Sequence, residues 1–128
     1  YKNKKTKLIK VKRKSISEAW NIGVKKSNGD VIGFLNSDDT FSNKNTIKKI
    51  VNTFKFKNCN SVYTDIFYVD DKGKIIRNWK ANIYSDKNQT YEYLTDKLKF
   101  GWMMPHPGLY LKKNLINKVG FFDNNYKV

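Results

Sequence analysis

The sequence predicts a single α/β domain, and three apolar patterns support this prediction. Apolar residues recur at helical spacing from Ile16 to Val24 and again from Ile47 to Phe54. Between these two stretches, the apolar run at 31–35 is too short for a buried helix and does not alternate with polar residues. We therefore expect a strand covered on both faces, as in a parallel sheet, with helices packed against it.

The first half of the chain contains two predicted strands and two predicted helices in alternation. Leu8–Val11 is a short strand candidate between lysines. The helix that follows begins at Ile16, with Ser15 or Ser17 as its N-terminal cap. Trp20 falls on the apolar face of this helix and is expected in the core. The order strand, helix, strand, helix is typical of an α/β layer.

The second half changes character, because β-branched and aromatic residues cluster at its start. The pattern predicts one strand at Ser61–Val69 and a second at 74–79, joined by the acidic turn at 70–73, so we expect a hairpin. The remaining predicted elements are a helix at 91–98, an irregular proline loop at 101–108, a strand at 109–111 and a helix at 114–119.

The composition limits both the number of domains and the class of partner. The 128 residues suffice for one domain with a core, but not for two of ordinary size. The formal charge of +15 attracts anionic ligands such as nucleotide diphosphates or lipid head groups. Only Arg13 and Arg77 are arginines, the residue type that best reads phosphates and guanines. A solvated lysine surface therefore explains the charge better than a nucleic-acid interface does.

The cysteine content and the hydropathy indicate the compartment. Cys59 is the single cysteine, so an internal disulfide and a multi-cysteine metal site are excluded, which fits a reducing compartment. No run approaches the roughly 18 apolar residues that span a bilayer, and the lysine-rich start has no apolar stretch behind it. We therefore expect a soluble, cytoplasmic protein without a signal peptide.

Two adjacent carboxylates, Asp38 and Asp39, follow the apolar run at 31–35. In open α/β sheets, ligands bind beyond the carboxyl ends of such strands. Adjacent carboxylates repel one another unless a cation or hydrogen-bond donors compensate their charge, and divalent cations with attached phosphates are common compensators. The pattern therefore indicates a metal-bound phosphorylated ligand. An acidic turn is the alternative, since Asn-Ser-Asp-Asp also suits turns and helix caps.

Three segments form a further pattern through their order and spacing. They are Ser17–Gly23 with Asn28–Asp30, then Ile32–Asp39, then Met104–Pro107 leading to Val119–Asp123. Together they resemble the inverting glycosyltransferases of family 2, whose fold is GT-A, a Rossmann-like α/β/α arrangement. The resemblance implies that residues 1–128 are an internal part of one such domain. It also implies the transfer of a sugar from a nucleotide-diphosphate donor to a glycan or lipid-linked acceptor.

The resemblance further implies roles for the two adjacent carboxylates. Asp38 corresponds to the residue that faces the ribose or the donor sugar, and Asp39 to the ligand of Mn²⁺ or Mg²⁺. Here the acidic motif is Ser37-Asp38-Asp39, without aspartate at both ends. A divalent ion that bridges a carboxylate and a diphosphate neutralises the charge on the departing nucleotide.

Glu18, Asn21 and His106 are the other donor-binding residues that the resemblance implies. Glu18 and Asn21 share one helical face, although helix capping by Glu18 and an ordinary polar role for Asn21 remain equal alternatives. His106 lies between two prolines in a loop that resembles the one covering donor and acceptor, where a lone histidine contacts ligand or is structural. Asp65 either borders the acceptor pocket or is a hydrogen-bonded edge residue.

The resemblance also implies that the fold is incomplete at both ends. An inverting transfer needs a carboxylate that takes the proton of the acceptor hydroxyl. The family pattern places this catalytic base beyond Val128, and the first nucleotide-binding strand before Tyr1. If the chain itself holds the base, Asp65, Glu92 and Asp123 are the candidates.

Two other functional classes stay open at this point. A missing base would favour a catalytically inert module that binds sugar nucleotides or glycans. The charge and the 15% aromatic content prompt a nucleic-acid-binding protein, although most aromatic residues fall at core spacings. The charge also leaves open a peripheral association with the inner face of a membrane.

Overall fold

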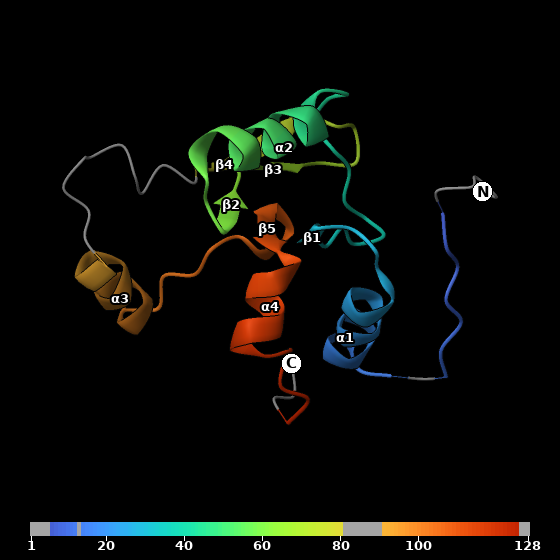
Figure 1. Ribbon diagram of the computed structural model, residues 1–128. Coiled ribbons are helices and arrows are strands. Elements are labelled where there is room, and N and C mark those ends of the chain that lie inside the picture. The colour runs from blue at the N-terminus through green and yellow to red at the C-terminus, as the bar shows by residue number, and fades with distance from the viewer. Residues whose placement is uncertain (1–5, 13, 81–90, 126–128) are drawn as a thin grey trace.

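A computed structural model describes residues 6–12, 14–80 and 91–125, and their secondary structure is mixed α/β (Figure 1). The elements, in chain order, are α1 (Ile16–Lys26), β1 (Val31–Gly33), α2 (Thr46–Lys57), β2 (Ser61–Tyr63), β3 (Ile66–Val69), β4 (Ile75–Trp79), α3 (Tyr91–Lys99), the 3₁₀ turn η1 (His106–Gly108), β5 (Leu109–Lys112) and α4 (Lys113–Val119). The predicted α/β class is confirmed at this level.

The main sheet has three strands in the order β1-β5-β2, and β5 runs antiparallel to both of its neighbours. The prediction of a parallel strand at Val31–Leu35 is therefore wrong in its pairing, and β1 already ends at Gly33. The strands β1 and β2 do run in the same direction, since both are antiparallel to β5, and the helix α2 forms the crossover between them. β5 comes from the far end of the chain and lies between them. An apolar run in the sequence indicates that a strand is buried. It does not indicate which other strand forms hydrogen bonds with that strand.

Helices cover both faces of this sheet, as the apolar run predicted (Figure 1). On one face, Phe54 of α2 packs with Tyr110 of β5. On the other face, Val24 of α1 and Ile116 of α4 pack with Ile32 of β1. Burial of these apolar side chains on both faces is the main stabilising contribution in such a layered fold.

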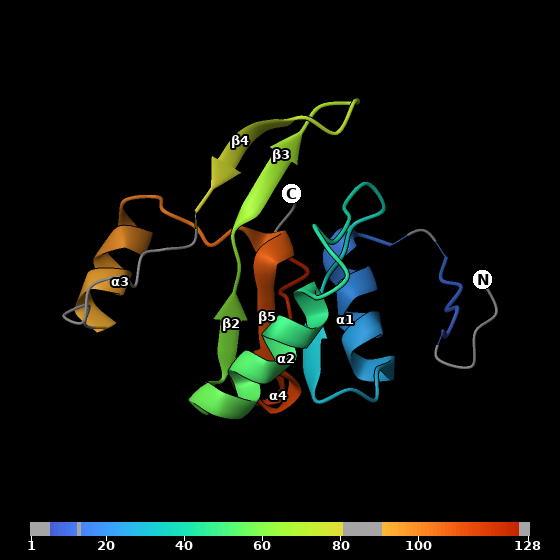
Figure 2. The same cartoon turned by 90° about the horizontal axis from the view of Figure 1, so that it is seen from above.

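The segment Ser61–Val69 forms two strands instead of the predicted one. Pairing stops at Thr64 and Asp65, between β2 and β3. The backbone NH of Thr64 donates to the carbonyl oxygen of Gly108 (3.0 Å). The two segments lie so close that a Cβ atom at Gly108 would be 2.8 Å from the Thr64 carbonyl oxygen. Beyond this break, β3 and β4 form the predicted hairpin, which extends past the main sheet (Figure 2).

The segment Leu8–Val11 does not form the predicted strand. Leu8 is 81% exposed, and none of the ladders in the described ranges contains residues 8–11. A strand requires a hydrogen-bonded neighbour, which a short apolar run between lysines does not provide by itself.

The other elements of the second half agree with the predicted ranges. The helix α3, the strand β5 and the helix α4 lie where the sequence predicts them, and Gly120 closes α4 with φ +103°. The proline loop, predicted to be irregular, contains the single turn η1. Within the described part of the chain, no helix is long and apolar enough to cross a membrane.

Candidate functional site

A cavity of about 330 Å³ lies at the carboxyl ends of β1 and β2. Asp38 and Asp39 follow β1, and Asp65 follows β2, and all three residues line the cavity. The parallel course of β1 and β2 explains this convergence, because it places both of their carboxyl ends at one edge of the sheet. Pro107 and Gly108, from the turn η1, complete this side of the cavity.

A tight turn orients the carboxylate of Asp39. The backbone NH of Asp39 donates to the carbonyl oxygen of Asn36 (3.2 Å). The side-chain amide of Asn36 donates to Oδ2 of Asp39 (2.9 Å). No other hydrogen bond within the described ranges reaches this carboxylate, which is partly buried. Its second oxygen, Oδ1, is thus available to a ligand.

Although the chain is strongly basic, Asp38 and Asp39 have no ion-pair partner among the residues that the structure describes. The ion pairs among the described residues are Lys14–Glu18 and Lys99–Asp96, and neither includes Asp38 or Asp39. The described residues also contain no group of three or more histidine, cysteine or acidic side chains that could hold a metal ion. The donor set fits a hard divalent cation that one or two carboxylates share with the phosphate oxygens of a ligand.

A larger cavity, of about 540 Å³, lies at the opposite end of β1. Asp30, Lys55 and Lys112 are among the residues that line it. It contains neither Asp38 nor Asp39, and it lies away from the carboxyl ends of β1 and β2, beside the carboxyl end of β5 at Lys112. We therefore take the smaller cavity as the candidate site.

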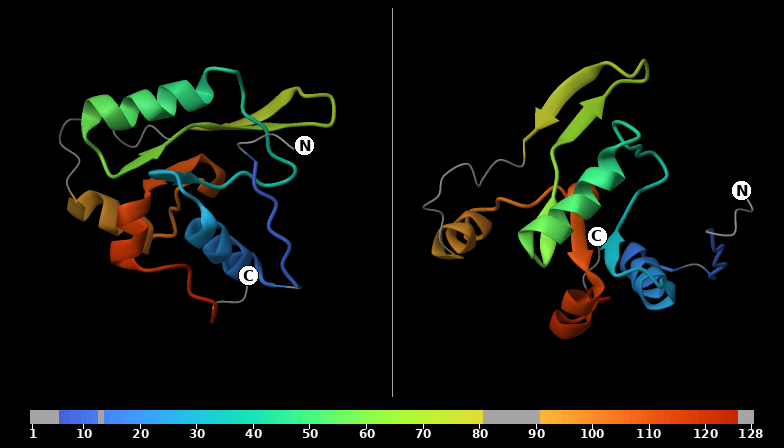
Figure 3. Two further views of the ribbon diagram at one scale, coloured as in Figure 1. Left: turned by 45° about the vertical axis from the view of Figure 1, so that its right-hand side comes forward. Right: turned by 45° about the horizontal axis from the view of Figure 1, so that its top comes forward.

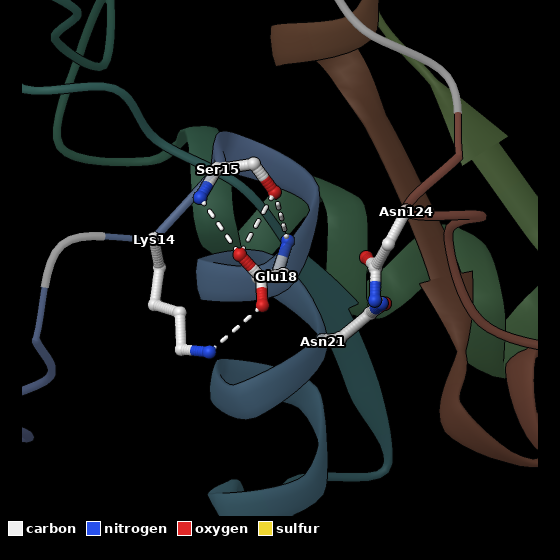
Figure 4. A network of polar contacts seen from close by, with 5 residues as sticks. All are labelled: Lys14, Ser15, Glu18, Asn21 and Asn124. Carbon is white, nitrogen blue, oxygen red and sulfur yellow. Dashed lines mark hydrogen bonds and ion pairs between the residues drawn. The ribbon is translucent and has the colours of Figure 1, made fainter.

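Glu18 closes a capping box at the start of α1 (Figure 4). Its Oε2 accepts from the backbone NH of Ser15 (3.0 Å), and its own NH donates to Oγ of Ser15 (3.2 Å). Lys14 donates to its Oε1 (2.8 Å), and this contact, followed by the Ser15 contact, lowers the pKa of Glu18 from 4.5. The carboxylate therefore stabilises the fold above pH 4.5, and this contribution is lost as the pH falls through the lowered pKa.

We expect the substitution Ser15→Ala to lower the free energy of unfolding by about 1 kcal/mol, because the cap of α1 is lost. Urea denaturation at neutral pH measures this change. Ser17→Ala is the matched control, since Ser17 is the cap candidate that the structure does not use. Equal losses in the two variants would contradict the assignment of the cap.

Asn21 connects α1 to the segment after α4. Its side chain is buried, and its amide nitrogen donates to the carbonyl oxygen of Phe122 (2.8 Å) and to Oδ1 of Asn124 (3.3 Å). Its amide oxygen accepts from the backbone NH of Phe122 (3.0 Å). The side chains of Asn21 and Asn124 face one another in Figure 4. Asn21 thus forms hydrogen bonds through both of its polar atoms within the fold.

His106 packs into an aromatic cluster that contains Trp20, Phe34 and Phe122. Its ring stacks on Trp20 with a centroid distance of 4.4 Å, and it lies 5.7 Å from Phe34 and 5.8 Å from Phe122. Trp20, which the sequence predicts to lie in the core, packs against Phe34 and Phe122, but it is only half-buried and is not one of the buried core residues. Burial among these rings lowers the pKa of His106 from 6.5, because the charged imidazolium loses hydration.

This pKa shift predicts a loss of stability in acid. Below pH 6.5 the unfolded chain takes up a proton at His106 more readily than the folded chain, so the free energy of unfolding falls as the pH decreases. The decrease continues until the lowered pKa of the folded state is reached. In His106→Phe, which keeps an aromatic ring without a titrating group, we expect a flatter profile in urea denaturation between about pH 5 and pH 7. If the free energy of unfolding has the same pH dependence in His106→Phe and in the unmodified chain, groups other than His106 cause the loss of stability in acid.

Glu18, Asn21 and His106 are not among the residues that line the cavity of Asp38 and Asp39. Pro107 and Gly108, which follow His106, do line this cavity. The stacking of His106 on Trp20 therefore holds one end of the segment that forms the cavity wall. Direct contact of these three side chains with a donor stays a prediction.

The remaining acidic candidates are distributed differently. Asp65 is not in mid-strand as predicted, because it lies in the break after β2, on the cavity wall. Asp123 accepts from the backbone NH of Asn125 (2.8 Å) and does not line the cavity. The side chain of Glu92 lies outside the described residues.

Sequence reasoning did not find the contribution of the hairpin to the cavity. Val69, Gly73 and Ile75 line it from β3, the turn and β4. Their local pattern indicates only an ordinary hairpin, and no signal in the sequence points to this contact.

One of the comparisons with known proteins covers the first two of the three segments described above and the Met104–Pro107 part of the third. The family model for glycosyl transferase family 2 matches residues 1–117. This span contains all residues that line the candidate cavity. No curated protein and no solved structure matches the chain.

Proposed function

The chain belongs to glycosyl transferase family 2, and on that premise we propose that it takes part in the transfer of a sugar from a nucleotide-diphosphate donor to an acceptor hydroxyl. We further propose a GT-A fold for this single domain, inversion at the sugar carbon and a requirement for Mn²⁺ or Mg²⁺. The observation that carries the proposal is the pair Asp38 and Asp39 in the cavity after β1, without an ion-pair partner among the described residues.

The two carboxylates have different tasks in this proposal. Asp38 is exposed on the turn and accepts hydrogen bonds from the hydroxyl groups of the ribose or the donor sugar. Asp39, which Asn36 orients, holds the divalent cation together with the diphosphate. The bound cation supplies charge neutralisation for the departing nucleotide.

The second set of predicted donor residues supports the site from a distance. Asn21 fixes the segment after α4 against α1, and His106 fixes the turn η1 against Trp20. The His106 contact restricts the loop that forms the cavity wall at Pro107, and Phe122, which Asn21 holds, packs against His106. We propose positioning roles for Asn21 and His106, and a capping role for Glu18, alongside any donor contact.

The acceptor side of the cavity begins at Asp65. This residue lies between the sheet strand β2 and the hairpin, and it lines the cavity together with residues of the hairpin. We propose that a glycan or lipid-linked acceptor enters here. A cytoplasmic location is part of the same proposal, supported by the single cysteine of the chain.

Calorimetric titration of the chain with UDP, GDP and CDP, each with and without Mn²⁺, tests this function. We expect at least one nucleoside diphosphate to bind, with an affinity that rises at least roughly tenfold when Mn²⁺ is present, because the cation links the phosphates to Asp39. Mg²⁺ in place of Mn²⁺ is expected to act in the same direction. Equal affinities with and without divalent cations would reject the metal-dependent site.

A further inference from the structure

The hairpin β3–β4 exposes an unusual number of apolar side chains. Val69 is 53% exposed, Ile75 is 54% exposed and Ile76 is 67% exposed, while Phe67 and Tyr68 are also exposed. The hairpin extends past the main sheet in Figures 2 and 3, and within the described ranges its two strands pair with one another and with no other strand. Adjacent exposed apolar residues in a strand pair are rare unless a ligand or partner covers them.

Part of this apolar surface belongs to the candidate site. Phe67, Val69 and Ile75 line the same cavity as Asp38 and Asp39. A β-bulge follows Tyr68, so that Val69 pairs with Ile75 and the ladder skips one residue of β4. Bulges re-aim side chains next to functional sites. The cavity therefore has a carboxylate-bearing wall after β1 and an aliphatic wall from the hairpin.

A nucleotide sugar does not match the second wall. Its diphosphate and hydroxyl groups need charged or hydrogen-bonding partners, which the β1 side of the cavity offers through Asp38, Asp39 and Ser42. Branched aliphatic side chains such as Val69 and Ile75 offer only dispersion contacts and burial of apolar area. An alkyl chain is the ligand part that gains from such a wall.

We propose that the β3–β4 hairpin binds the alkyl chain of an amphiphilic acceptor, so that the acceptor class is lipid-linked and not a free glycan. This inference rests on the proposed function, because it assigns the acceptor side of the same cavity. The polar head of the amphiphile lies beside Asp65, and its chain runs along Phe67, Val69 and Ile75. The continuity of the two walls within one cavity determines this orientation.

A series of glucosides with one head group and increasing chain length tests the proposal. Methyl, hexyl and octyl β-D-glucoside are titrated into the chain by calorimetry, at concentrations below those at which they form micelles. We expect the Kd to fall roughly two- to fourfold for each added methylene that the hairpin buries. In Ile75→Ser, octyl glucoside should bind about tenfold more weakly, while methyl glucoside binding is unchanged.

Ile76→Ser is the matched control. Ile76 is the next residue of β4 and is also exposed, but it does not line the cavity. This variant should retain the dependence on chain length, and circular dichroism should show that both variants fold. Equal losses in the two variants, or equal affinities for methyl and octyl glucoside, would overturn the proposal. Capture of the chain by phospholipid vesicles without any dependence on chain length would instead identify a bilayer contact.

Binding of nucleoside diphosphate with Mn²⁺, measured in the same variants, separates this inference from the proposed function. Ile75→Ser should leave that binding intact, since Ile75 lies on the acceptor wall. If the unmodified chain binds nucleoside diphosphate normally but shows no dependence on alkyl chain length, the acceptor assignment alone is rejected. Absence of nucleotide binding in the unmodified chain rejects the function on which the assignment rests.

Discussion

Replacement of Asp39 by asparagine is expected to reduce the Mn²⁺-dependent affinity for a nucleoside diphosphate by roughly 100-fold. Loss of a residue that hydrogen-bonds to a metal ligand typically lowers metal affinity roughly 10- to 100-fold. Loss of the ligand itself should therefore lower the affinity by at least about 100-fold. The amide keeps the size of the side chain and its hydrogen bond with Asn36 can be rearranged, so the fold is retained. Calorimetry with and without Mn²⁺ measures the effect.

Asp71→Asn is the matched control for this experiment. Asp71 is an exposed carboxylate in the hairpin turn and does not line the cavity. It removes the same negative charge from the chain, so it reports any general electrostatic change in nucleotide binding. Equal reductions in Asp39→Asn and Asp71→Asn would contradict a specific metal site.

The substitution Asn21→Ala is expected to lower the free energy of unfolding by about 3 kcal/mol. The buried amide forms hydrogen bonds with the backbone NH and carbonyl of Phe122 and with Asn124, and its loss leaves backbone groups without these partners. Each unsatisfied buried group costs about 1–3 kcal/mol. Urea denaturation monitored by circular dichroism measures the change, and Asn52→Ala, at an exposed position of α2, should be close to neutral.

The same variant distinguishes two roles of Asn21. If Asn21 only positions the segment after α4, the folded fraction of Asn21→Ala binds nucleoside diphosphate with nearly unchanged affinity. If Asn21 contacts the donor, affinity falls while Asn21→Asp, which keeps an acceptor for the Phe122 NH, recovers part of it. An unchanged stability would contradict the structural role directly.

Local chemistry was sufficient to predict most helices. The Ser15 cap with Glu18, the helical spacing of apolar residues and the closing Gly120 are interactions within a few residues, so their pattern is visible in the sequence. The carboxylate pair after β1 was visible for the same reason, since a strand and the turn that follows it are contiguous. The family followed from three segments whose order the sequence preserves, and the family match confirms it.

Strand pairing depended on segments that lie far apart in the sequence. Leu8–Val11 has an apolar pattern but no ladder among the described residues, whereas β5 pairs with both β1 and β2. The break at Thr64 requires the close approach of Gly108, more than forty residues later, which no local pattern contains.

The sequence by itself determined the α/β class, the family and the position of Asp38 and Asp39, because these depend on local periodicity and on the order of short motifs. Only the tertiary structure decided that Asp65 and the hairpin share their cavity, and that Asn21 and His106 face other parts of the fold. The physical reason is that a cavity forms where chain segments converge. Convergence depends on hydrogen bonds and packing between distant residues, which a single sequence does not display.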